Sequence, residues 1–126
     1  MRVAFFVGLA GVAILSSPVQ AQDMRLDTFL EKAERLERRG PLALVSSDFG
    51  LLKGEVEAAS SLYRERLVAD RAGGRAPHSC PPERGSARLG SDDLLAHFRS
   101  YPASRRPSIT VRRAFFDMMA QRFPCD

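Results

Sequence analysis

Apolar residues recur three and four positions apart between residues 48 and 72, and this spacing constrains the fold more than any other feature of the sequence. One apolar face of the stretch consists of Phe49, Leu52, Val56, Ala59, Tyr63 and Leu67. A second apolar strip beside it consists of Leu51, Ala58, Leu62 and Ala69. The spacing is that of an amphipathic α-helix, and two strips favour packing on both sides. We therefore expect a long central helix from about Asp48 to Ala72, ended by Gly73-Gly74. Gly54 within it should allow the close approach of a neighbouring helix, since glycine otherwise costs about 1 kcal/mol there.

Three shorter helices are expected around the long one. They span about residues 28–39, 91–101 and 108–123, with Asp27, Ser91 and Ser108 as N-caps. Their inward residues are expected to be Phe29, Leu30, Ala33, Leu36, Leu94, Leu95, Phe98, Val111, Ala114, Phe115, Met118, Met119 and Phe123. After the first helix, "LALVSS" forms a short apolar connection of about one helical turn. The sequence therefore predicts an all-α fold, a small bundle of approximately four helices with one long central helix.

The N-terminal stretch has the three parts of a secretory signal. Arg2 precedes an apolar run from Val3 to Leu15, and Pro18 and small residues follow it. Cleavage is expected between Ala21 and Gln22. The run is shorter than the ~20 apolar residues that span a bilayer, so we expect no stable membrane anchor. The pattern predicts export to the periplasm.

The chain has two cysteines, Cys80 and Cys125. In an oxidising compartment they are expected to pair, whereas in a reducing one they would remain free thiols. A bond between them would close a loop of about 45 residues, which the chain-entropy model values at ~4 kcal/mol. We therefore expect residues 22–126 to form a single domain cross-linked by one disulfide.

Catalysis and metal binding find little support in the sequence. His78 and His97 have no ligand-type spacing to another histidine, cysteine or carboxylate, so neither a metal site nor a cofactor is expected. Asp92-Asp93 follow Ser91 directly and are expected to favour the dipole of their helix. The net charge of +4 is spread along the chain, which argues against nucleic-acid binding. The protein is expected not to be an enzyme.

The stretch "GGRAPHSCPPERGSARLG", residues 73–90, has no helical or strand periodicity. Loops of this length in compact domains are usually functional or disordered, and a disulfide at Cys80 would hold this one in place. An ordered loop loses less entropy on binding, which favours affinity. We expect it to contact a partner through four polar side chains, Arg75, His78, Glu83 and Arg84.

The C-terminal half, "HSCPPERGSARLGSDDLLAHFRSYPASRRPSITVRRAFFDMMAQRFPC", resembles that of the Tai-like immunity proteins of type VI secretion systems. The matching features are Cys80-Pro81, a capped helix that ends at Tyr101-Pro102, and a last helix that closes with Phe123-Pro124-Cys125. The chain departs from the family in lacking its second cysteine pair. The resemblance implies a helical periplasmic protein that binds a secreted peptidoglycan amidase and blocks its active site.

Two other classes remain open from the sequence. One is a periplasmic chaperone or holdase, a class for which small disulfide-linked helical domains are suited. The other is an envelope interaction protein without a toxin partner. A homodimer is compatible with all three classes.

Overall fold

The computed structural model describes residues 23–83 and 89–126, and their regular structure is helical. The elements are α1 (Leu26–Arg39), η1 (Gly40–Val45), α2 (Ser47–Ala72), α3 (Ser91–Ser100), η2 (Arg106–Ser108) and α4 (Val111–Arg122). The prediction of a small all-α bundle is therefore confirmed. The connection after α1 is helical as expected, but it is a 3-10 helix of six residues, about two turns instead of one. The expected signal and its cleavage site at Ala21 and Gln22 lie outside the described residues. Within those residues no helix is both long and apolar enough to cross a membrane.

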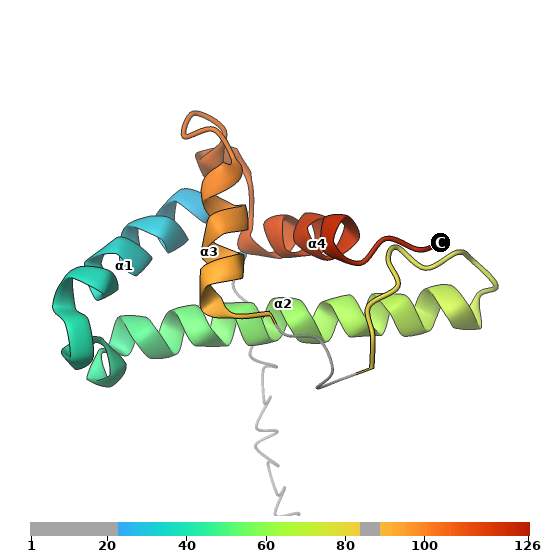
Figure 1. Cartoon of the computed structure of the whole chain (residues 1–126), viewed down its shortest axis with the longest axis horizontal. Coiled ribbons are helices and arrows are strands. Elements are labelled where there is room, and N and C mark those ends of the chain that lie inside the picture. Colours follow the sequence, from blue (N-terminus) through green and yellow to red (C-terminus); the bar gives the residue numbers. More distant parts are fainter. Residues whose placement is uncertain (1–22, 84–88) are drawn as a thin grey trace, which may run out of the picture.

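The long helix α2 runs the length of the molecule, and the other helices gather on one side of it (Figure 1). It packs against α1 and α4, and α3 packs against α1 and α4 as well. The predicted inward residues Leu52, Ala59, Tyr63 and Leu67 are buried. Phe49, at the start of the helix, is instead 38% exposed.

The prediction that α2 is packed on both sides is wrong. In the second apolar strip, Leu51 is 39% exposed and Ala69 is also exposed, while Ala58 and Leu62 are only half-buried. The three other helices are short, and together they cover one face of a 26-residue helix. Gly54 has no close neighbour either, since a Cβ built there would meet nothing within 4 Å. Packing on both sides of α2 and a close helix contact at Gly54 would both need more helical chain than the three shorter helices provide.

The starts of α1 and α4 are set by one isolated antiparallel bridge, between Arg25 and Thr110. The Leu26 amide donates to the Ile109 carbonyl at 2.8 Å, and the Val111 amide donates to the Met24 carbonyl at 2.8 Å. These bonds hold the residue before each helix in an extended conformation, so each helix begins directly after the bridge.

The bridge explains why two predicted N-caps are wrong. Asp27 lies inside the first turn of α1, where its carboxylate accepts a hydrogen bond from the Thr28 amide. Ser108 belongs to η2, and Thr110 caps α4 by accepting a bond from the Arg113 amide at 3.1 Å. The third cap, Ser91, is displaced by one residue.

Helix α3 begins after Gly90. The Gly90 amide donates to the carboxylate of Asp93 at 3.0 Å, a contact of the kind that closes a capping box. This hydrogen bond, together with Arg122, lowers the pKa of Asp93. The prediction that the acidic pair serves the first turn of its helix is thus confirmed for Asp93.

The core consists of two clusters that α2 connects. The first lies among α1, the first half of α2, α3 and the start of α4, and in it the Phe29 and Phe98 rings meet edge to face at 5.3 Å. The second lies between α2 and α4 around Tyr63 and Met118. The inward residues predicted for α1, α3 and α4 are confirmed: Leu36, Leu94, Leu95 and Phe123 are half-buried and the others are buried.

Among the residues that the structure describes, Glu55 is the one charged residue that is buried, at 8% exposure. Burial raises the pKa of its carboxyl above the usual value of 4.5, although a hydrogen bond from the Met24 backbone opposes the shift. The nearby charge of Asp23 raises the pKa further. Glu55 is therefore a carboxylate that the fold tolerates better when it is protonated.

The predicted disulfide between Cys80 and Cys125 is confirmed, with a Cα–Cα distance of 4.9 Å. It joins residues 45 positions apart, and the Cys80 amide donates to the Phe123 carbonyl at 2.8 Å beside it. The bond therefore fixes the chain after α4 against the segment that follows α2.

Replacing Cys125→Ala should lower the free energy of unfolding by about 2–5 kcal/mol, the usual cost of losing a native disulfide in a small domain. Urea denaturation measures this change. Adding reductant to the wild type should produce a similar loss and should leave the variant unaffected. Equal urea midpoints for the variant and the oxidised wild type would contradict a stabilising role of the disulfide.

Replacing Glu55→Gln should raise the thermal midpoint at neutral pH, because it removes a buried charge and keeps an acceptor for Met24. A raised folded-state pKa means that the unfolded chain binds fewer protons, so stability falls as the pH rises through the titration range of Glu55. The advantage of Gln should therefore shrink on acidification and vanish below about pH 4. Calorimetry measures the thermal midpoints. If the difference in midpoint between the variant and the wild type does not change with pH, the stabilisation does not come from removing a buried charge.

Candidate functional site

The segment of residues 73–83, here called the disulfide segment, lies beside the last turns of α2 and the end of α4 (Figure 1). Tyr63 of α2 fixes its middle. The Tyr63 hydroxyl lies 3.1 Å from Nδ1 of His78 and also bonds the hydroxyl of Ser79, which is fully buried. The segment is thus attached to α2 by hydrogen bonds and to α4 by the disulfide.

Aromatic contacts hold Tyr63 in position. Its ring meets Phe116 edge to face at 4.8 Å, Phe115 at 6.2 Å and His78 at 5.7 Å. Burial raises the pKa of the Tyr63 hydroxyl, although the bond to Ser79 opposes the shift. Tyr63 therefore stays protonated at neutral pH and acts as a hydrogen-bonding anchor for the disulfide segment.

Arg75 folds back onto the end of α2. Its Nε lies 3.4 Å from the Asp70 carboxylate, and its guanidinium donates to the Ala69 carbonyl at 3.3 Å. A cation at this position also favours the negative end of the helix dipole. The side chain remains exposed, so the same guanidinium is accessible to a partner.

The four predicted contact residues have different surroundings. Arg75 and Glu83 are exposed, whereas His78 is half-buried against Tyr63. Arg84 lies outside the described residues. The structure therefore assigns His78 to the anchoring of the segment and leaves Arg75 and Glu83 on its accessible face.

A second polar cluster, which the sequence did not predict, connects α3 to α4. The Tyr101 hydroxyl donates to the Asp117 carboxylate at 3.0 Å and lies 3.2 Å from Nε2 of His97. Arg113 contacts both Asp117 oxygens at 3.2 Å. The spacing of Arg113 and Asp117, four positions apart on one helix, could have indicated their pairing, but Tyr101 comes from a distant part of the chain.

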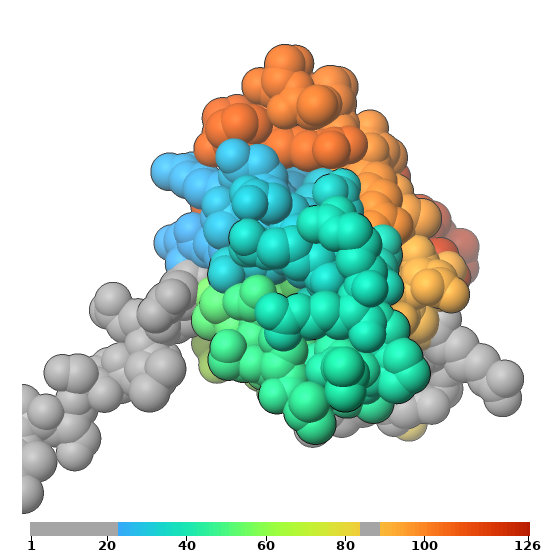
Figure 2. Space-filling view, turned by 90° about the vertical axis from the view of Figure 1, so that its left-hand side faces the viewer, coloured from blue at the N-terminus to red at the C-terminus, as the bar shows by residue number. Residues whose placement is uncertain are grey.

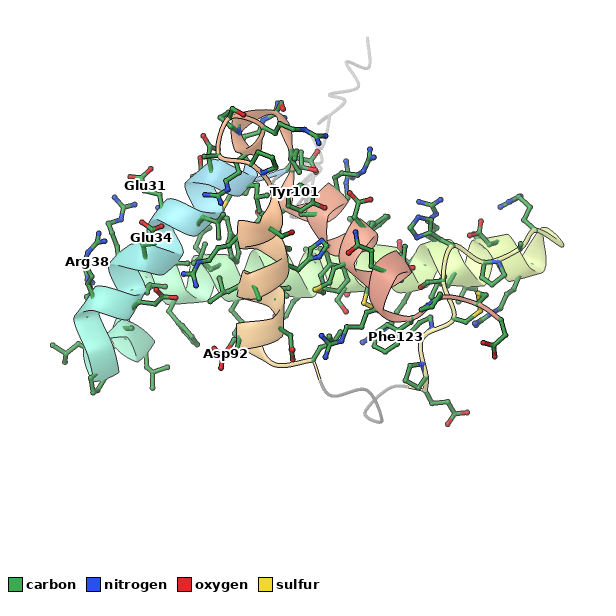
Figure 3. All side chains as sticks on the ribbon, turned by 45° about the horizontal axis from the view of Figure 1, so that its top comes forward. Glu31, Glu34, Arg38, Asp92, Tyr101 and Phe123 are labelled. Carbon is green, nitrogen blue, oxygen red and sulfur yellow. A yellow bond between two sulfur atoms is a disulfide. The ribbon has the colours of Figure 1, made fainter. Side chains whose placement is uncertain are left out.

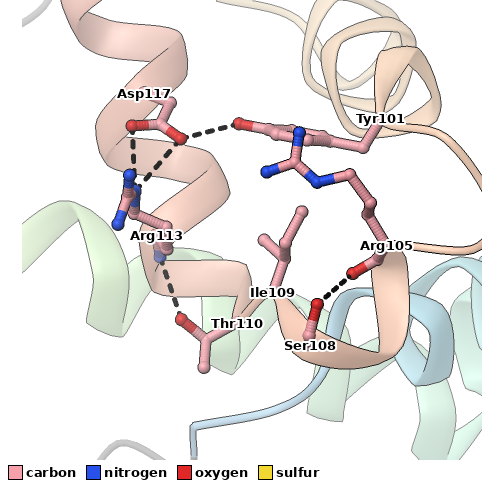
Figure 4. Close-up of a pocket in the computed structure, with 7 residues that line it drawn as sticks. All are labelled: Tyr101, Arg105, Ser108, Ile109, Thr110, Arg113 and Asp117. Atoms are coloured by element: carbon pink, nitrogen blue, oxygen red, sulfur yellow. Dashed lines mark hydrogen bonds and ion pairs between the residues drawn. The ribbon is translucent and has the colours of Figure 1, made fainter.

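This cluster borders a depression of about 310 Å³, lined by Tyr101, Arg105, Ser108, Ile109, Thr110, Arg113 and Asp117 (Figure 4). Burial, and then the bond to Asp117, raise the pKa of Tyr101 to about 12. Burial lowers the pKa of His97, with Asp117 opposing, so His97 is mainly neutral at pH 7. Tyr101 cannot act as a base there, and Asp117 is occupied by two partners. The arrangement is that of a structural contact between helices.

Neither polar cluster offers the ligands of a metal ion. In residues 23–83 and 89–126 no group of three histidine, cysteine or acidic side chains is close enough to hold one. Two arginines near the second cluster are engaged within the chain: Arg106 donates to the Tyr101 and Arg99 carbonyls, and Arg112 pairs with Asp23 at 3.2 Å.

The far end of the molecule carries an exposed apolar surface. We call it the apolar tip and define it as Leu42, Leu44, Val45 and Phe49. The three residues of η1 are 71%, 68% and 84% exposed, respectively. Figure 2 looks onto this end, where the chain turns from α1 through η1 into α2. The labelled side chains Glu31, Glu34 and Arg38 show how α1 leads to the tip with charges on its outer face (Figure 3).

Replacing Tyr63→Phe should destabilise the protein by about 1–3 kcal/mol, because the buried Ser79 hydroxyl would lose its partner. Amide exchange of Cys80 should also become faster, since the segment around it would be held less firmly. Urea denaturation and hydrogen exchange measure the two effects. Tyr101→Phe is the matched control and should leave exchange at Cys80 unchanged. Unaltered exchange in Tyr63→Phe would show that the disulfide alone orders the segment.

No protein-family model, curated protein or solved structure matches the chain.

Proposed function

We propose that this protein is exported to the periplasm, binds a secreted peptidoglycan amidase of a type VI secretion system, and blocks its active site. The proposal starts from the resemblance of the C-terminal half to Tai-like immunity proteins. One structural observation carries it further: the disulfide and the hydrogen bonds of Tyr63 attach the middle of residues 73–83 to the rest of the domain.

Pre-ordering gives this segment the properties of an inhibitory surface. A fixed loop loses little conformational entropy on binding, so more of its contact energy becomes affinity. Arg75 and Glu83 lie on its exposed side. Arginine is enriched among the residues that dominate binding energy at interfaces, and a guanidinium already held by Asp70 is partly ordered before binding.

The purified protein should inhibit an amidase encoded in the same genome at equimolar ratio. Replacing Arg75→Ala together with Arg84→Ala should weaken binding by at least about tenfold, the effect expected for an interface arginine. Arg64→Ala is a matched control, because Arg64 is exposed on α2 and makes no bond with a described residue. Titration calorimetry measures the affinity for the amidase, and peptidoglycan hydrolysis assays measure its inhibition.

Two results would contradict the proposal at different levels. If the double variant binds as tightly as the wild type, the disulfide segment is not the contact surface. If no amidase from the genome binds at micromolar concentration, the immunity function itself is wrong.

A chaperone or envelope interaction protein is the second candidate function, and the apolar tip favours it. Exposed apolar patches on small proteins mark interaction surfaces. A holdase would delay the aggregation of unrelated unfolded proteins, whereas an immunity protein would not. An envelope interaction protein would instead bind a partner other than an amidase.

A further inference from the structure

No described residue packs over the apolar tip, although exposing its aliphatic and aromatic side chains to water is unfavourable. Leu42, Leu44 and Val45 are consecutive or nearly so on the short turn η1, and Phe49 adds its ring from the first turns of α2. Single exposed apolar residues are ordinary in soluble proteins, but four on one turn and its neighbour form a patch.

Two arginines beside the tip make no ion pair with a described residue. Between residues 35 and 53 there are four basic residues, Arg35, Arg38, Arg39 and Lys53, and two acidic ones, Glu37 and Asp48. Both acids are paired, Asp48 with Lys32 at 2.9 Å and Glu37 with Arg99 at 2.7 Å. Two of the cations are paired as well, Arg35 with Glu31 at 3.4 Å and Lys53 with Glu57 at 3.7 Å. Arg38 and Arg39 therefore remain as the cations of this end whose charge no acidic side chain of the described residues neutralises.

Two of these cations lie directly next to η1. Arg38 and Arg39 form the last turn of α1. Arg39 donates to the Ser46 hydroxyl at 3.3 Å, which places its guanidinium across the base of the turn. Arg38 makes no bond with a described residue and is exposed. Both guanidinium groups are accessible to an anionic surface.

The shape of this end does not suit a peptide or a small ligand. Figure 1 places η1 at the extremity of the molecule, where the chain reverses. The depression beside Tyr101 lies elsewhere, along η2 and α4. A second depression, between α3 and α4, is also remote from this end and is lined by Asp93, His97, Met118, Gln121 and Arg122. A protruding apolar turn with adjacent cations is suited to a soft anionic surface into which its side chains can insert.

We propose that the apolar tip docks on an anionic lipid bilayer. Leu42, Leu44 and Val45 enter the boundary between headgroups and acyl chains, and the arginines bind headgroup phosphates. A second copy of the chain is the poorer occupant, because a symmetric contact would oppose Arg38 and Arg39 to their own copies. The proposal does not depend on an amidase partner.

The expected binding is reversible and sensitive to salt. A short apolar insertion is weaker than a lipid anchor, and its electrostatic part is screened over about 10 Å at 0.1 M salt. Such docking differs from a membrane-spanning anchor, since the protein would exchange between the bilayer surface and solution.

The test is vesicle flotation of the chain that begins at Gln22, because the apolar run from Val3 to Leu15 would bind lipid by itself. Residues 23–83 and 89–126 contain both core clusters and the disulfide, so this chain retains the fold. It should float with vesicles of equal parts phosphatidylglycerol and phosphatidylcholine, and not with phosphatidylcholine alone.

Variants separate insertion from charge. Leu44→Ser with Val45→Ser should weaken binding at least about tenfold, because two apolar side chains would no longer be buried. Val68→Ser is the matched control, since Val68 is 63% exposed on another part of α2. Arg38→Gln should weaken binding about fivefold, whereas Arg64→Gln should not.

Three results would overturn the proposal. The first is absence of flotation with the anionic vesicles. The second is equal binding by the Leu44→Ser/Val45→Ser variant and the wild type. The third is a dimer in solution that this variant converts to a monomer, which would assign the tip to a second copy. Loss of amidase inhibition in the same variant, without any vesicle binding by the wild type, would assign the tip to a protein partner instead.

Discussion

The packing of α4 on α2 is the interaction on which the rest of the structure depends. Met118, Met119 and Phe115 of α4 bury themselves against Ala59, Tyr63 and Leu67 of α2. This contact brings the end of the chain within reach of Cys80, and it gives Tyr63 the aromatic surroundings in which its hydroxyl holds Ser79. It also places α4 where α3 can close over its outer side.

Much of this architecture could be predicted from the sequence because it depends on local patterns. Helix positions follow from apolar spacing, and the end of α2 follows from Gly73-Gly74. The disulfide follows from two cysteines and an expected oxidising compartment. The burial of Ala114, Met118 and Phe98 is likewise predictable, because the spacing of apolar residues indicates which face of a helix is buried.

The features that could not be predicted depend on pairs of residues that are distant in the sequence. The bridge between Arg25 and Thr110 moved the starts of two helices, and no local signal for it exists. The contact of Tyr101 with Asp117 and that of Tyr63 with His78 likewise arise only from tertiary packing. Spacing alone also could not show that the start of α2 lacks a cover, because an apolar residue looks the same in a sequence whether or not a partner reaches it.

The length of α2 has a geometric consequence. Its 26 residues make a rod of about 39 Å at a rise of 1.5 Å per residue. The apolar tip lies at one end of this rod, and the disulfide segment extends from the other end back to Tyr63, about 25 Å from the start of the helix. The two surfaces are therefore well separated, and one molecule can bind a different partner at each end, with α2 as the spacer between the partners. A body bound at one end would leave the other end free to engage a second body.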